Sequence, residues 1–131
     1  MEPDLIGRFL VTAFFAVVFL QSALDKLSDS AGNLEFLAGH FKNGPFPPAM
    51  VTRMFWILTA LEATAGILCG LGLVFFSFTR AGLNLASLGL TVSSLALLAL
   101  ITGQRFAKDY AGAAVVAAYF AVALVGLIFF A

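Results

Sequence analysis

Long apolar stretches separated by short polar links dominate the chain. A helix needs about 20 mostly apolar residues to cross a membrane. Four stretches meet that length: residues 5–27, 51–76, 80–102 and 110–131. Short links follow the second and third stretches, which favours antiparallel neighbours. The pattern predicts an all-α membrane protein, a single up-down bundle of four transmembrane helices that occupies residues 1–131.

The segment 28–50 is the one long polar interruption between these stretches. Asp29 or Ser30 can cap a short helix, and apolar residues then recur at helical spacing over 34–41, as in an interfacial amphipathic helix. The run 43–48 contains three prolines, which cannot continue a helix. We therefore predict a short interfacial helix and a Pro-rich loop between the first two spans. The alternative is a plain connector.

An up-down order predicts which links share a side of the membrane. Both termini and the link 77–79 would lie at one end, the terminal end, and the segments 28–50 and 103–109 at the other, the loop end. Basic residues are more numerous at the loop end, which favours a cytoplasmic location for it and termini outside. We expect a bacterial-type cytoplasmic (inner) membrane.

The amino-acid composition argues against several classes of function. The chain is 62% hydrophobic and 11% charged, whereas soluble domains are roughly 25% charged. Its net charge of zero provides no basic surface for nucleic acid. Cys69 is the single cysteine and His40 the single histidine, so we expect no disulfide, metal site or haem. No catalytic motif is present, and we expect no catalysis by this chain alone.

Glu62 lies in the middle of the second apolar stretch. An ionisable group at bilayer depth costs at least roughly 2.5 kcal/mol unless it is paired, protonated or hydrated, so it should face the bundle interior. A rise of about 1.5 Å per residue places Tyr119, Thr91 and Ser94 at similar depth and Gln21 nearer the loop end. We predict Tyr119, Thr91 and Ser94 as its hydrogen-bond partners, and Gln21, Ser22 and Asp25 as the lining of a polar funnel that narrows toward it.

A carboxyl group that has only neutral donors around it avoids its charged form in a low-dielectric medium. Glu62 would then carry a proton or donate a hydrogen bond to a ligand carbonyl, such as that of a quinone. The alternative is a structural role, in which the carboxyl group only joins helices.

Two further polar groups lie at the two ends of the predicted bundle. At the loop end, charged residues could form an ion-pair cluster at the mouth of a polar funnel that leads to Glu62; they are Asp25, Lys26, Arg105 and Asp109. At the terminal end, Arg8 and Arg80 could extend to lipid headgroups or form a paired anion site.

Small residues recur along three of the apolar stretches, where they allow helices to approach closely. They are Gly66 and Gly70; Gly82, Ala86, Gly89 and Ser93; and Ala113, Ala117 and Ala121. We predict packing within the bundle, and the alternative is the interface of a homo-oligomer.

Several motifs, taken in order, resemble those of the DoxX family of small four-helix membrane proteins. They are the run Phe19 to Leu27, the segment Gly44-Pro45-Phe46-Pro47 before the second span, the run Glu62 to Gly72, and Arg80. The resemblance covers nearly the whole chain. Ala23 stands where the family usually has a glycine. Arg8, Lys26, Glu62 and Arg80 match the family's polar positions.

The resemblance implies a four-helix bundle associated with quinone-coupled membrane redox systems. Thiol-oxidising proteins of similar layout need cysteine pairs, which this chain lacks. We therefore expect an accessory or quinone-associated subunit of a membrane oxidoreductase or respiratory complex, with a larger membrane complex or a second copy as partner. Two alternatives stay open: a small proton, solute or lipid carrier or channel in which Glu62 couples transport, and a purely structural subunit.

Overall fold

A computed structural model describes residues 2–76 and 80–131 of the chain. The helices are α1 (Pro3–Ser28), α2 (Ser30–His40), α3 (Pro48–Phe75), α4 (Arg80–Phe106) and α5 (Tyr110–Phe129). All but α2 are long and apolar enough to cross a membrane. This confirms the predicted all-α fold with four spans and a short helix between the first two. The predicted link 77–79 lies outside the described residues.

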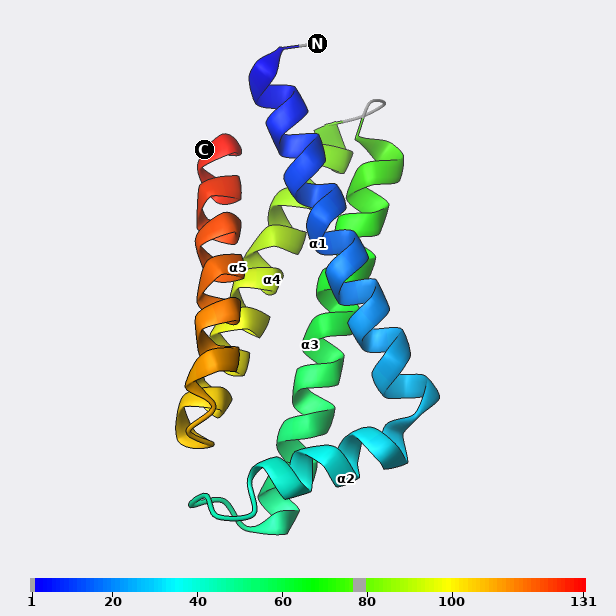
Figure 1. Cartoon of the computed structure of the whole chain (residues 1–131). Helices are drawn as coiled ribbons and strands as arrows, with labels where there is room; N and C mark the ends of the chain where they lie inside the picture. Colours follow the sequence, from blue (N-terminus) through cyan, green and yellow to red (C-terminus); the bar gives the residue numbers. More distant parts are fainter. Residues whose placement is uncertain (1, 77–79) are drawn as a thin grey trace.

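The four long helices run along one common direction, and α2 lies across one end of the bundle (Figure 1). The helix α3 packs against both α1 and α4, and α5 packs mainly against α4. The start of α1 and the end of α5 lie at the opposite end from α2. The terminal end and the loop end are therefore arranged as the up-down order predicts.

Local sequence signals explain where the helices begin. Asp29 caps α2, because its Oδ1 atom accepts a hydrogen bond from the backbone N–H of Gly32 at 3.2 Å. Asp109 caps α5 in the same way, with Gly112 as donor at 3.0 Å. The helices α1 and α3 begin at proline, whose missing N–H has no partner in a first turn anyway. Of the two predicted caps for α2, the aspartate is the one used.

Glycines of α3 and α4 bring backbones into contact. A Cβ atom on Gly66 would lie 2.8 Å from the backbone nitrogen of Leu20, so α1 approaches α3 there at a distance that only glycine permits. Added Cβ atoms on Gly72 and Gly89 would lie equally close to α4 and α3, respectively. The prediction of packing within the bundle is confirmed for these two helices.

The predicted packing of small residues along α5 is wrong in part. Ala113 is buried, but Ala117 and Ala121 are exposed. The buried side of α5 instead carries Ala113, Val116, Ala123 and Gly126. Residues spaced exactly four apart do not stay on one side of a helix that has 3.6 residues per turn. Ala117 and Ala121 therefore turn away from the side on which Ala113 is buried.

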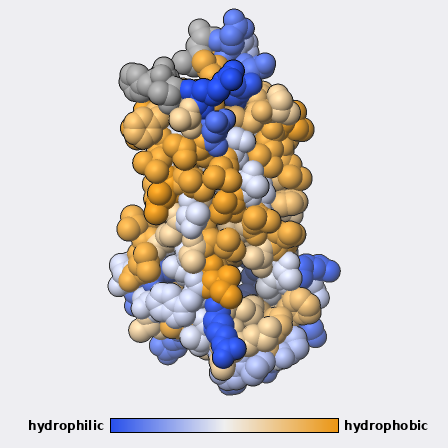
Figure 2. Space-filling view, turned by 180° about the vertical axis from the view of Figure 1, so that it is seen from behind, coloured by the Kyte–Doolittle hydropathy of each residue, from blue (hydrophilic) through white to orange (hydrophobic). Residues whose placement is uncertain are grey.

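The outer surface has the polarity that a membrane requires. A hydrophobic band covers the middle of the molecule, and hydrophilic residues gather at both ends (Figure 2). Large apolar side chains point outward within the band, for example Val17 and Ile128, which are 67% and 71% exposed. A soluble bundle would bury such side chains, so the exposed band is the surface that contacts lipid.

Candidate functional site

Glu62 of α3 is buried inside the bundle, as predicted, with 1% of its side chain exposed. The Ser22 hydroxyl donates a hydrogen bond to its Oε2 atom. The Lys26 ammonium lies 3.1 Å from each carboxylate oxygen and donates to Ser22 Oγ at 2.9 Å. These three residues form a closed polar cluster, called here the Glu62 cluster.

The positions of Ser22 and Lys26 on α1 explain why they meet Glu62. They are four residues apart and therefore share one face of the helix. The neighbouring positions Phe19 and Ala23 are buried, so this face points toward the other helices of the bundle. The Lys26 side chain is 18% exposed, because its long aliphatic stem carries the ammonium inward from near the end of α1. The result is an ion pair of no net charge.

The partners of Glu62 differ from those predicted. The Thr91 hydroxyl donates to the carbonyl of Ser87, and the Ser94 hydroxyl to that of Leu90. Hydroxyl groups within helices often bond the preceding turn in this way. Gln21 is exposed.

Tyr119 packs edge-on against Phe14, with ring centroids 5.7 Å apart. A count of residues from the end of a span gives the level of a residue along the helix, but it gives no direction around the helix. The roles of Tyr119, Thr91, Ser94 and Gln21 in binding a ligand or proton stay predictions.

The ion-pair cluster predicted at the loop end is not formed among the described residues. Asp25 is exposed, and Lys26 turns inward to Glu62. Asp109 instead faces His40 of α2, with Oδ2 and Nε2 3.5 Å apart. The Arg105 guanidinium lies over the ring of Tyr110, 4.6 Å from its centroid. The buried carboxylate attracts Lys26 more strongly than a solvated surface carboxylate can.

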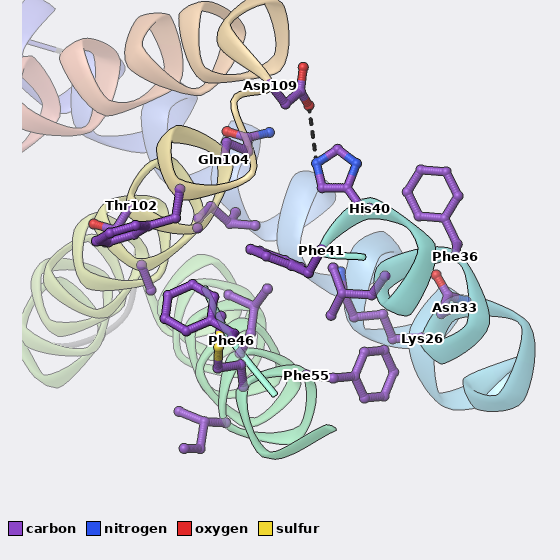
Figure 3. Close-up of a pocket in the computed structure, with 18 of the residues that line it drawn as sticks. Lys26, Asn33, Phe36, His40, Phe41, Phe46, Phe55, Thr102, Gln104 and Asp109 are labelled. Carbon is purple, nitrogen blue, oxygen red and sulfur yellow. Dashed lines mark ion pairs between the residues drawn. The ribbon is translucent and has the colours of Figure 1, made fainter. Parts of the chain in front are cut away.

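A pocket of about 640 Å³ opens at the loop end between α2, α3 and α4. Its walls are mainly apolar and include the side chains of Phe36, Phe41, Phe46, Phe55 and Phe106. Figure 3 shows the rings of Phe36, Phe41, Phe46 and Phe55 together with a few polar side chains, which come from different helices. Ligand pockets in proteins have this size and this combination of apolar walls and few polar groups.

The polar residues that line the pocket are Lys26, Asn33, His40, Thr102, Gln104 and Asp109. Lys26 lines it on the side of α1, so one residue belongs both to the pocket and to the Glu62 cluster. Gln104, His40 and Asp109 line it where α4 meets α5. Within the described ranges, Gln104 Oε1 is a buried acceptor without a hydrogen-bond partner. A donor from a bound molecule would satisfy it, since an unpaired buried acceptor costs about 1–3 kcal/mol.

Sequence reasoning missed the pocket and four of its polar residues, Asn33, His40, Thr102 and Gln104. The pocket depends on how α2 folds back under the bundle, which no local pattern specifies. One signal was available for the Glu62 cluster: Ser22 and Lys26 stand at helical spacing near the end of an apolar span. Arg8 and Arg80 lie far from this site, at a hollow of the terminal end.

The described residues contain no group of three or more His, Cys, Asp or Glu side chains that could hold a metal ion. Comparisons of the chain with models of protein families, with curated proteins and with solved structures find no match. The resemblance to the DoxX family therefore stays a prediction. Length, apolarity and the exposed hydrophobic band lead to one conclusion: the chain is a multi-pass membrane protein with four long apolar helices.

Proposed function

We propose that this membrane protein binds a quinone in the loop-end pocket and acts as an accessory subunit of a membrane oxidoreductase or respiratory complex. The observation that carries the proposal is the position of Lys26, which lines the pocket while it pairs with the buried Glu62. The motifs that resemble the DoxX family support the redox setting, and Lys26 and Glu62 are two of its matching polar positions.

The pocket fits a quinone in size and in chemistry. A quinone ring is flat and apolar apart from two carbonyl oxygens on opposite sides, and the pocket has aromatic walls with a few polar groups, among them Lys26 and Gln104. An ammonium has three N–H groups. If one N–H is shared by both oxygens of Glu62 and a second donates to Ser22, the third is free to donate to a ligand carbonyl.

The residues of the pocket have separate roles in this proposal. Lys26 donates to the carbonyl oxygen, and Glu62 with Ser22 holds the ammonium in place. Gln104 Oε1 accepts from a hydroxyl group when the ligand is in its reduced form. The bound quinone supplies the electron chemistry, and the protein supplies position and hydrogen bonds.

A pocket-filling substitution tests where the quinone binds. Ala99 lines the pocket, so Ala99→Trp should weaken the binding of a short-tailed ubiquinone to the purified full-length protein by at least about tenfold, about 1.4 kcal/mol. Ala114→Trp is the matched control, because Ala114 of α5 is exposed and lies outside the pocket. Equal affinity for the two variants would place the quinone elsewhere or show that none binds.

A second experiment tests the accessory role. The native protein is purified in mild detergent, and mass spectrometry identifies the polypeptides and lipids recovered with it. Recovery with cytochrome or iron–sulfur subunits and with stoichiometric quinone is the expected result. Recovery of the chain alone with bulk phospholipid would contradict the proposal and favour the carrier alternative, which liposome flux assays measure.

A further inference from the structure

A second hollow, of about 460 Å³, lies at the terminal end of the bundle, at the opposite end from the quinone pocket. It is lined by Arg8, Arg80, Leu83, Asn84, Ser87 and Phe130. Nothing in the proposed function uses these residues. Two cations from different helices therefore share a hollow at one edge of the hydrophobic band.

The residues of α4 reach this hollow because of their spacing. Arg80, Asn84 and Ser87 are separated by four and three positions, so they share one face of the helix. Arg80 also begins α4, where the helix dipole places its positive end. This face of α4 presents one cation and two neutral hydrogen-bond donors.

Arg8 enters from α1 and is held in place rather than free to move. Its Nε atom donates to the carbonyl of Phe129 at 2.5 Å, at the end of α5. Its guanidinium carbon lies 5.5 Å from the ring centroid of Phe130. A guanidinium has five N–H groups, so these contacts leave most of its donors for another partner.

The hollow carries the positive charge of Arg8 and Arg80. Among the described residues that line it, none has an acidic side chain. Neither Arg8 nor Arg80 forms an ion pair in the part of the chain that the structure describes. Asp4, one turn before Arg8, is exposed and does not line the hollow. Two unpaired guanidinium groups with adjacent neutral donors form a site for an anion.

We propose that this hollow binds the phosphate group of an anionic phospholipid. Phosphate oxygens match the planar N–H pairs of arginine, and Asn84 and Ser87 supply further donors. The hollow lies at the edge of the hydrophobic band, at the level of lipid headgroups. Leu83 and Phe130 add apolar walls next to the cations, which suit the glycerol and upper acyl chain of a lipid better than a free phosphate ion.

Native mass spectrometry of the full-length protein in mild detergent tests this proposal. The wild type should retain phosphatidylglycerol about tenfold better than phosphatidylcholine with the same acyl chains. Arg8→Gln combined with Arg80→Gln should abolish that preference. The matched control removes two exposed cations at the loop end, Lys42→Gln with Arg53→Gln, and should leave the preference unchanged.

Several outcomes decide the proposal. Equal retention of the two lipids by the wild type would overturn it, and so would equal loss of preference in the control. Displacement of phosphatidylglycerol by millimolar inorganic phosphate would assign the site to free phosphate and overturn the lipid source. If the double arginine variant fails to fold, Asn84→Leu provides a second test of the same site. Asn84 is exposed, and its loss should lower the preference severalfold, whereas an unchanged preference would contradict the site.

Discussion

Two pairs of charged residues in the bundle differ in whether they form ion pairs within the protein. Toward the loop end, Lys26 forms an ion pair with Glu62 inside the bundle, where Nζ and Oε2 are 3.1 Å apart. The terminal end contains Arg8 and Arg80, which lie around one hollow and form no ion pair among the described residues. Depth explains the difference. A charge inside the bundle has to find its partner in the protein, whereas a charge at headgroup level can find it in lipid.

The two sites differ in whether the protein itself provides partners for their charged groups. The Glu62 carboxylate has its partners within the protein, and of the three cluster residues only Lys26 lines the adjacent pocket. The cations of the terminal end are incomplete without an anion. Substitutions that leave one charge of the Glu62 cluster unpaired should therefore affect mainly stability, and substitutions of the terminal-end arginines mainly lipid preference.

The largest effect is expected from breaking the buried ion pair. Lys26→Met leaves the Glu62 carboxylate buried and without its cation, which should lower the free energy of unfolding by about 3–5 kcal/mol. Reversible unfolding in mixed micelles measures the change. Lys42→Met is the control, because Lys42 is exposed and outside the cluster, and it should change stability by less than about 0.5 kcal/mol. Similar losses for both variants would contradict a buried pair.

The close approach of α1 and α3 should be the next most sensitive feature. Gly66→Ala places a Cβ atom 2.8 Å from the Leu20 backbone and should destabilise the protein by about 1–3 kcal/mol through overpacking. Gly70→Ala is the control, since its Cβ would meet only a side-chain atom of Leu20 at 3.7 Å. The same unfolding assay should separate the two variants, and an equal cost would show that this contact does not position the cluster.

Loss of the Ser22 hydroxyl should have an intermediate effect. It donates to a buried carboxylate, and hydrogen bonds to charged groups contribute about 1.5–3 kcal/mol. Ser22→Ala should therefore cost about 1.5 kcal/mol of unfolding free energy. Ser94→Ala serves as the control, because the Ser94 hydroxyl bonds only the Leu90 carbonyl one turn before it. A larger cost at Ser94 would favour the partners predicted from depth.

The smallest effect on stability is expected at the terminal end. Arg8→Gln removes the hydrogen bond to the Phe129 carbonyl and the contact with the Phe130 ring, which should cost about 1 kcal/mol. Arg53→Gln, at an exposed position of α3, should cost less than about 0.5 kcal/mol. A loss above 3 kcal/mol for Arg8→Gln would mean that this arginine is a core contact and not an open cation.

Sequence patterns predicted the fold because lipid imposes a simple rule. A span must be long and apolar, and the four spans follow from that rule alone, whereas the short helix at the loop end follows from its capping residue and the helical spacing of apolar residues over 34–41. The burial of Glu62 followed from the cost of a charge in lipid. These predictions depend on single segments and not on how segments pack.

The arrangement of the site could not be predicted in the same way. Lys26 and Glu62 are 36 positions apart, and their contact depends on the register of α1 against α3, which the close approach at Gly66 sets. Lys26 stood near the end of its span and was therefore assigned to the surface, although its stem is long enough to reach the carboxylate. The pocket requires α2 to fold back beneath α3 and α4, a long-range property of the structure.

The central claim is that Lys26, held by Glu62, binds a quinone from the pocket. The variant Lys26→Met with Glu62→Gln tests it most directly, because it removes the ammonium without leaving a buried charge. Equilibrium titration of the purified protein with a short-tailed ubiquinone should show affinity at least about tenfold weaker than that of the Lys42→Met control, with unfolding free energy near the wild-type value. Affinity equal to that of the control would contradict the claim.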